Sequence, residues 1–320
     1  VRQNPSAERV PMEAWIQRDV AVEMFRQAGL DFEQEKIKAR SRDFQPVELK
    51  GATIDAKFDV KTDQITTHNV LAKLVGSTHP NETILYTGHW DHIGMGEPDA
   101  NGDRIFNGAV DNASGTAGLL ELARQWAKGP KPERTIVMIS FTGEESGLLG
   151  SEFYAANPLY PLETTVAGFN LDASSVLGRM SKLGVTGYGQ SELDERVIAL
   201  AAAQGRGFEG DAGAGAGIYF RSDHFPLAKR GVPMGYLSST GDYVDEPIAP
   251  RLAAAAEYRA NRYHQAADEW EPTWDYRGMI QDLEVVFDAG QALANSRDWP
   301  EWKSGSEFGP ARTVSAARRK

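Results

Sequence analysis

Two adjacent glutamates, Glu144 and Glu145, follow the most strand-like segment of the chain. Residues 136–141 are almost all apolar and show no alternation, which is typical of a strand that is buried on both faces of a sheet. In open α/β sheets, ligands bind just beyond the carboxyl ends of the strands. Taken alone, a pair of glutamates in a loop is more simply a solvated surface feature. Its meaning therefore depends on the polar residues elsewhere in the chain.

Histidines and carboxylates occupy similar places after other predicted strands or in adjoining loops. These residues are His89, Asp111, Glu144 with Glu145, Asp172 and His264. Imidazole and carboxylate ligands without thiolates suit Zn²⁺ or a similar divalent ion. Three carboxylates and two histidines are too many for one open zinc site. They suit two ions that share a carboxylate, about 3.5–4 Å apart.

Six motifs resemble metallopeptidase family 28, the co-catalytic di-zinc exopeptidases that include secreted bacterial leucyl aminopeptidases. The motifs are His89-Trp90-Asp91, Asp111-Asn112-Ala113-Ser114-Gly115, Glu144-Glu145-Ser146-Gly147-Leu148-Leu149-Gly150-Ser151, Asn170-Leu171-Asp172, Arg221-Ser222-Asp223-His224 and Tyr263-His264. They occur in the order of the family and cover residues 69–295.

The resemblance implies a ligand set for two Zn²⁺ ions, with Mn²⁺ or Co²⁺ as alternatives. Asp111 would bridge both ions, His89 and Asp172 would complete one site, and Glu145 and His264 would complete the other. Glu144 would remain free as the general base, which takes a proton from a metal-bridging water and passes it to the leaving amine.

The resemblance also implies supporting roles near the metals. We expect Asp91 to orient His89, because an imidazole ligand usually donates its other N–H to a carboxylate or a carbonyl. Tyr263 would stabilise the developing oxyanion, and Arg221 would lie near the substrate backbone. A cis peptide bond is expected between Asp111 and Asn112.

Other histidines and acids are expected to have structural roles. His92 adjoins a motif, and we interpret it as a supporting residue rather than a third imidazole ligand. Asp223 and His224 are expected to serve the fold, while His68 and His79 are expected at the surface.

The elements that must position these groups alternate between strands and helices, which predicts an α/β fold with three layers, α/β/α, around a mostly parallel mixed sheet. Strands are predicted over 69–74, 83–87, 136–141, 166–171 and 232–237, and helices over 13–28, 114–127, 148–156, 193–203 and 273–294. Leu119, Leu120, Leu122 and Trp126 are predicted to be core residues.

The predicted organisation has three parts. Residues 1–66 form a helical and irregular segment that packs on the core, with an edge strand and loops over 30–66. Residues 67–296 form the catalytic domain, and 297–320 form an extension that ends as a loose basic tail. The glycine-rich stretch 210–217 is interpreted as a flexible loop because it lacks the spacing of a nucleotide-binding loop.

Composition limits the partners. The 320 residues carry a formal net charge of -11, which argues against a nucleic-acid or anionic-membrane partner. No apolar run approaches the roughly 18 residues that a membrane span needs, and the absence of cysteine excludes disulfides and thiolate sites. Because the chain opens at Val1 rather than Met, we expect that a leader or a longer upstream segment has been removed, and we expect a periplasmic or secreted location rather than a cytoplasmic one.

The leading functional hypothesis is a zinc-dependent aminopeptidase that hydrolyses the N-terminal bond of a peptide substrate. Carboxypeptidase and dipeptidase activities on the same scaffold are alternatives. Glutaminyl cyclase activity is disfavoured because those relatives use one zinc ion, and a non-catalytic binding protein is disfavoured because no expected ligand is missing. The preferred substrate residue and the oligomeric state stay open.

Overall fold

The computed structural model describes residues 12, 14–59, 61, 64–211, 213–317 and 319. Apart from Val1, the chain divides into two compact units, residues 2–66 and residues 67–320. The irregular segment 1–11, the expected helix start at residue 13, position 212 of the glycine-rich loop, and Arg318 and Lys320 of the basic end lie outside the described residues.

The first unit contains two helices, α1 (Arg18–Gln27) and α2 (Phe32–Lys38). Asp31 caps α2 by accepting a hydrogen bond from the Gln34 N–H, and charged pairs three residues apart support the helix. The edge strand predicted within 30–66 is therefore wrong, since the described residues of this range hold α2 and no strand. Glu35 is the one buried side chain among the described residues of this unit. The packing of residues 1–66 on the core stays a prediction.

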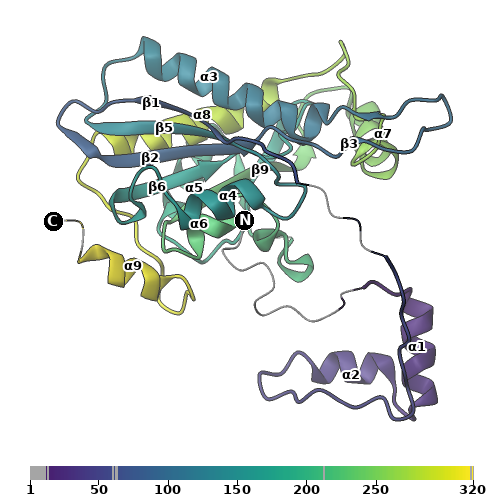
Figure 1. Ribbon diagram of the computed structural model, residues 1–320. Helices are drawn as coiled ribbons and strands as arrows, with labels where there is room; N and C mark the ends of the chain where they lie inside the picture. Colours follow the sequence, from purple (N-terminus) through teal and green to yellow (C-terminus); the bar gives the residue numbers. More distant parts are fainter. Residues whose placement is uncertain are drawn as a thin grey trace. The chain divides into compact units, whose positions relative to one another are not determined.

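The second unit is built on a seven-stranded sheet in the order β1-β5-β2-β6-β9-β7-β8 (Figure 1). The strands are β1 (Val70–Leu74), β2 (His79–His89), β5 (Arg134–Phe141), β6 (Thr165–Asn170), β7 (Met180–Val185), β8 (Gly207–Glu209) and β9 (Met234–Tyr243). The four central strands β5, β2, β6 and β9 are parallel, whereas β1 and β7 run antiparallel to their neighbours β5 and β9. A separate two-stranded ribbon joins β3 (Gly94–Met95) and β4 (Ile105–Phe106). The mostly parallel mixed sheet is confirmed.

Helices cover both faces of this sheet, as Figure 1 shows. The helices that contribute to the cores are α3 (Gly115–Lys128), α5 (Leu193–Ala203) and α8 (Arg277–Ala294) on one face, and α4 (Leu149–Ala156) and α6 (His224–Ala228) on the other. The second unit also contains α7 (Ile248–Glu257) and α9 (Gly309–Ala316). Successive residues of β2 point to opposite faces. Ile84 and Tyr86 join the core formed with α3, α5 and α8, whereas Leu85 joins the core formed with α4 and α6. The three-layer α/β/α architecture is thus confirmed.

The register of the parallel strands brings distant residues to one edge of the sheet. His89, at the end of β2, pairs with Phe141 of β5, and Thr87 of β2 pairs with Asn170 of β6. Residues 144–145 and Asp172 follow within a few positions of these pairs. Parallel strands end on the same side, so these groups emerge together beyond their carboxyl ends.

Helix α3 shows why one predicted core residue is wrong. Leu119, Leu122 and Trp126 are buried at spacings of three and four residues, which mark one face of a helix. Leu120 lies one position away from that face and is 69% exposed. Leu120 was predicted to be buried because it is apolar, but the buried face of α3 is formed by Leu119, Leu122 and Trp126 instead.

The described residues of the C-terminal extension pack on the rest of the second unit. Helix α9 carries Arg312, which is almost fully buried and donates hydrogen bonds of 2.7 Å to the carbonyl oxygens of Thr165 and Val166. Trp302 and Phe308 are also buried, in a small apolar cluster with Tyr219. The extension therefore packs on the sheet at the start of β6.

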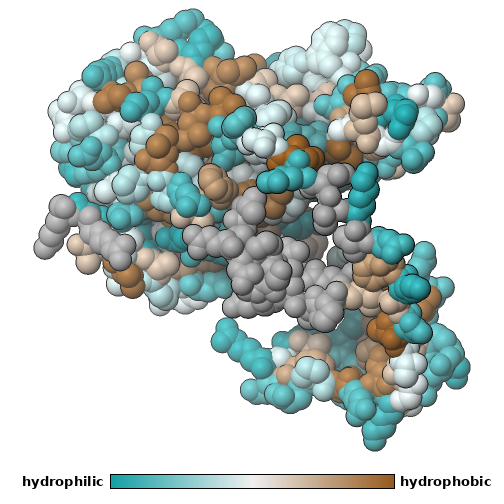
Figure 2. Space-filling view, in the orientation of Figure 1, coloured by the Kyte–Doolittle hydropathy of each residue, from teal (hydrophilic) through white to brown (hydrophobic). Residues whose placement is uncertain are grey.

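The surface shows hydrophilic residues interspersed with apolar ones on the face seen in Figure 2. Among the described residues, none of the helices is both long enough and apolar enough to cross a membrane.

Candidate metal centre

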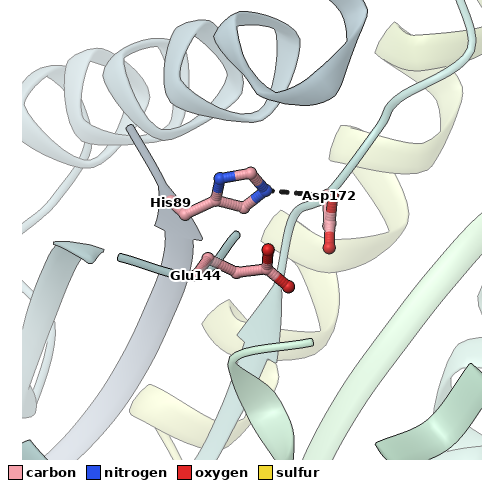
Figure 3. Close-up of side chains that lie close together, drawn as sticks. All are labelled: His89, Glu144 and Asp172. Carbon is pink, nitrogen blue, oxygen red and sulfur yellow. Dashed lines mark hydrogen bonds and ion pairs between the residues drawn. The ribbon is translucent and has the colours of Figure 1, made fainter. Parts of the chain in front are cut away.

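His89 stands at the centre of a group of carboxylates. Its Nε2 lies 3.3 Å from Oδ1 of Asp111 and 3.4 Å from Oδ1 of Asp172. Its Nδ1 lies 3.0 Å from the carbonyl oxygen of Asp91, to which it donates. That bond fixes the tautomer and leaves Nε2 free to bind a cation. Figure 3 shows His89 directed at Asp172, with Glu144 alongside.

His264 approaches the same aspartate from the opposite side. Its Nε2 lies 3.1 Å from Oδ2 of Asp111 and 3.4 Å from Oε2 of Glu145. The two oxygens of Asp111 therefore face two different imidazoles, His89 and His264. This is the arrangement that a carboxylate shared between two cations requires.

Two groups of ligand atoms are compact enough to hold an ion, with all atoms of each group within 4.8 Å of one another. One consists of His89, Glu144 and Asp172, and the other of His92, Asp111 and Glu145. All five residues expected as ligands thus lie around these groups, with His264 contacting the second. His92 lies closer to the site than the sequence led us to expect, since its Nδ1 is 2.6 Å from Oε1 of Glu145.

The residues present fit divalent cations. Glu144, Glu145, Asp111 and Asp172 form no ion pair with any lysine or arginine among the residues described, although they are buried or half-buried. Both ring nitrogens of His92 and Oε1 of Glu145 are buried without a properly oriented hydrogen bond. Carboxylates in such surroundings need positive charge, and an all-oxygen-and-imidazole set suits Zn²⁺.

Asp91 orients His89 as expected, through its backbone carbonyl oxygen, and its carboxylate makes a separate contact. It accepts hydrogen bonds from the backbone N–H groups of Glu144, at 3.1 Å, and Glu145, at 3.3 Å. Its Oδ1 is 3.8 Å from Nδ1 of His89, too far for a hydrogen bond. The Asp91 backbone orients His89, whereas its side chain fixes the turn that carries both glutamates.

The loop before α3 holds Asp111 through contacts that the sequence did not reveal. The peptide bond between Asp111 and Asn112 is cis, as the resemblance implies. Asp268 accepts hydrogen bonds from the N–H groups of Val110, at 3.0 Å, and Asp111, at 3.2 Å. It is 1% exposed. Asp268 lies four residues after His264, so one short segment supplies an expected ligand and the support of the bridging aspartate.

Asn112 ties the same loop to the neighbouring strand ends. Its Nδ2 donates to the carbonyl oxygens of Leu171 and His89, and its Oδ1 accepts from the N–H groups of Gly115 and Ala173. A Cβ at Gly115 would lie 2.3 Å from Oδ1 of Asn112, so only glycine permits this close approach.

Asp172 is oriented by a chain of polar side chains. The Ser222 hydroxyl donates to Oδ2 of Asp172 at 2.5 Å, and Nδ2 of Asn170 donates to Oγ of Ser222 at 2.8 Å. Oδ1 of Asn170 in turn accepts from the Thr87 hydroxyl. Asp223 and His224, beside Ser222, are fully buried. Asp223 accepts a hydrogen bond from Ser151, in keeping with a structural role.

The carboxylates around His89 favour a positive charge at its imidazole. Burial opposes protonation of His89, but hydrogen bonds to Asp111 and Asp172 outweigh it and raise the pKa of the imidazole to about 12. The field that would hold a proton there would also hold a metal cation. Burial raises the pKa of Glu144 to about 9; His89 opposes this rise, and the carboxylates of Asp172, Asp223 and Glu145 add to it.

A cavity of about 910 Å³ opens over these groups. Tyr263, Arg221 and Tyr236 line it together with the carboxylates. Burial and the nearby carboxylates raise the pKa of Tyr263 to about 12, so its phenol remains a hydrogen-bond donor at neutral pH. His68 is exposed and His79 is half-buried, and neither lines the cavity.

The backbone is strained around the cavity. Leu148, Ala173 and His264 are the non-glycine residues with positive φ among those described, at 60°, 51° and 57°, and all three line the cavity. Such conformations cost roughly 1–3 kcal/mol each and cluster at functional sites.

Parts of the chain are similar to known proteins. A probable zinc metalloprotease of Pyrenophora teres f. teres (strain 0-1) is 43% identical over 104 residues, which are 32% of this chain and 21% of that protein. Aminopeptidase NAALADL1 of Mus musculus is 33% identical over 130 residues, which are 39% of this chain and 16% of that protein. The chain spans about a fifth of the length of these curated relatives.

Solved structures show the same fold. The crystal structure of BSAP, a zinc aminopeptidase from Bacillus subtilis, matches with a TM-score of 0.53 and 24% identity, over 72% of this chain and 51% of that chain. LapA aminopeptidase of Legionella pneumophila matches with a TM-score of 0.52 and 19% identity, over 88% of this chain and 66% of that chain. The sequence profile of Peptidase family M28 matches residues 69–287, a range that contains every ligand candidate described above. The chain therefore belongs to peptidase family M28.

Proposed function

We propose that this protein is a zinc-dependent exopeptidase that acts as an aminopeptidase. The observation that carries the proposal is the position of Asp111 between His89 and His264, with Asp172 and Glu145 completing the two sides. The five groups would hold two Zn²⁺ ions, with Asp111 shared. The names of the relatives, zinc metalloprotease and aminopeptidase, support the same reading.

Zinc at this position would supply Lewis-acid chemistry, polarising the peptide carbonyl and activating water as the nucleophile. Glu144 makes no ion pair with a lysine or arginine in the described part of the chain, and its carboxylate lines the cavity. It would accept the proton of the attacking water and deliver it to the leaving amine. The phenol O–H of Tyr263, which also lines the cavity, would donate to the oxygen of the scissile carbonyl as negative charge develops there.

Carboxypeptidase and dipeptidase activities use the same chemistry and differ in which end of the peptide is recognised. A blocked-substrate series separates them. An aminopeptidase cleaves leucyl-glycinamide but not N-acetyl-leucyl-glycine, a carboxypeptidase shows the reverse pattern, and a dipeptidase requires both free ends. We expect the aminopeptidase pattern.

Metal removal tests the proposal as a whole. Dialysis against a strong chelator should abolish hydrolysis, and added Zn²⁺ should restore it. Thermal unfolding before and after dialysis shows whether the fold has survived, so that lost activity can be assigned to the lost metal. Hydrolysis that continues in protein shown by elemental analysis to be free of metal would overturn the mechanism.

A further inference from the structure

Two arginines line the cavity without a carboxylate partner. Arg221 and Arg259 are both exposed, and neither forms an ion pair with any described residue. Arg259 lies in the helical turn Tyr258–Arg262, directly before Tyr263 and His264. Arg259 therefore lies five residues before His264, a proposed metal ligand, in the sequence.

The arginines near Arg259 in the fold are paired. Arg262, in the same turn, contacts both Glu257 and Glu271. Arg251, in α7, contacts Asp275. These pairs anchor the segment that carries Arg259, yet no acidic side chain of the described residues neutralises Arg259 itself. Its charge is left available to a ligand.

Arg259 also lies at the junction of two cavities. Beside the large cavity over the ligand groups there is a second one of about 360 Å³, and both are lined by Ala173, Tyr258 and Arg259. The second cavity is lined by apolar side chains, among them Val176, Met180 and Trp274, and by polar and charged ones. A peptide that occupies the large cavity would pass Arg259 where the two cavities meet.

The positive charges of Arg221 and Arg259 are not needed to neutralise the carboxylates of the proposed metal site. Two divalent ions carry four positive charges, and the carboxylates of Asp111, Glu144, Glu145 and Asp172, which line the cavity, carry four negative charges. The ions and these ligand carboxylates therefore offset one another without Arg221 and Arg259. Each guanidinium keeps its positive charge and can pair with an anionic group of a substrate.

We propose that Arg259, with Arg221, binds a carboxylate of the substrate, so that the enzyme prefers peptides that carry a carboxylate close to the scissile bond. This rests on the proposed peptidase function and specifies its substrate class. The carboxylate belongs either to the C-terminus of a short peptide or to an acidic side chain next to the cleaved bond. Arginine recognises either one through the same paired hydrogen bonds.

Four leucyl substrates distinguish the two sources. Leucyl-glycine is compared with leucyl-glycinamide, and leucyl-aspartamide, which keeps its β-carboxylate, is compared with leucyl-asparaginamide. Within each pair only the charge changes. We measure kcat/KM for the zinc-loaded wild type and for Arg259→Gln, Arg259→Lys and Arg230→Gln. Arg230 is a matched control, because it is exposed and unpaired among the described residues but does not line the cavity.

The ratio of kcat/KM within a pair is independent of the amount of folded enzyme. For the wild type we expect kcat/KM to be about tenfold higher for the substrate with the carboxylate in at least one pair. A tenfold ratio corresponds to about 1.4 kcal/mol, close to the contribution of one hydrogen bond to a charged group. Arg259→Gln should bring that ratio close to one, Arg259→Lys should restore part of it, and Arg230→Gln should leave it at the wild-type value. A preference in the first pair identifies the C-terminal carboxylate, and one in the second identifies the side chain.

Ratios near one in the wild type, or ratios unchanged by Arg259→Gln, would overturn this proposal while leaving the peptidase function standing. Hydrolysis of none of the four substrates, nor of the same series with other N-terminal residues, by the zinc-loaded protein would overturn both.

Discussion

Asp268 is predicted to control metal affinity without touching the metal. Both of its carboxylate oxygens accept backbone N–H groups, those of Val110 and Asp111. Asp268→Asn keeps one acceptor oxygen and turns an NH₂ group towards the other N–H. At least one hydrogen bond to a charged acceptor is lost, at roughly 1.5–3 kcal/mol, and two donors then face each other. The loop would relax, and Asp111 would leave the position between His89 and His264.

We therefore expect the zinc affinity of Asp268→Asn to fall by about 10- to 100-fold, the range for groups that support metal ligands. Competition with a chromophoric zinc chelator measures this directly. Asp282→Asn is a matched control, because Asp282 is also a buried carboxylate but is held by Arg206 and Ser239 and does not line the cavity. It should lose stability and keep its zinc affinity. An affinity for Asp268→Asn within twofold of the wild type would refute the reasoning.

Four further outcomes are expected. Glu144→Gln should keep bound zinc while kcat falls about a hundredfold or more; near-normal turnover with zinc retained would mean that the base lies elsewhere. Tyr263→Phe should lower kcat more than it raises KM, because its hydrogen bond forms mainly in the transition state; an effect confined to KM would contradict this. Arg312→Leu should lower the free energy of unfolding by about 2–6 kcal/mol, because two buried carbonyls lose charged donors at roughly 1–3 kcal/mol each; urea denaturation measures the loss, and an unchanged midpoint would mean that the C-terminal helix is not anchored. Burial lowers the pKa of His224 from 6.5 to about 3, so between these pH values the unfolded chain binds more protons than the folded one. Stability should therefore fall as the pH drops from 6.5 towards 3. His224→Phe should reduce this dependence of stability on pH, and equal slopes in the wild type and the variant would contradict the prediction.

The sequence predicted the elements and the site because both leave local signals. A buried strand such as β5 is an unbroken apolar run, and its polar continuation at Glu144 and Glu145 marks the carboxyl end. Parallel pairing then requires such ends to meet, although only the structure supplies the register that sets His89 beside Phe141.

Contacts between distant segments could not be predicted in the same way. Arg312 is a polar residue near the end of the chain, and nothing local indicates that it donates to carbonyls at the start of β6. Asp268 is one of several acidic residues in its segment, and its role depends on a loop more than 150 positions earlier, since it accepts the N–H of Val110 at a separation of 158 residues. The prediction for Leu120 was wrong for the opposite reason, because its side chain is apolar but its position on the helix is exposed.

Asp91 orients His89 as expected, and the structure identifies the atom that does so. The carbonyl oxygen of Asp91 is the acceptor, because the side chain is engaged by the two backbone N–H groups of the glutamate turn. His92 shows a similar limit, since its distance from Glu145 depends on how the loop after β2 folds back towards that turn.

The proposed mechanism requires Asp111 to be shared by two metal ions. Crystals of the zinc-loaded protein, measured at the zinc absorption edge, locate those ions. We expect two anomalous peaks about 3.5–4 Å apart, one bonded to His89 and Asp172, the other to Glu145 and His264, and both to Asp111. A single peak, peaks that do not share Asp111, or zinc bound elsewhere would contradict it.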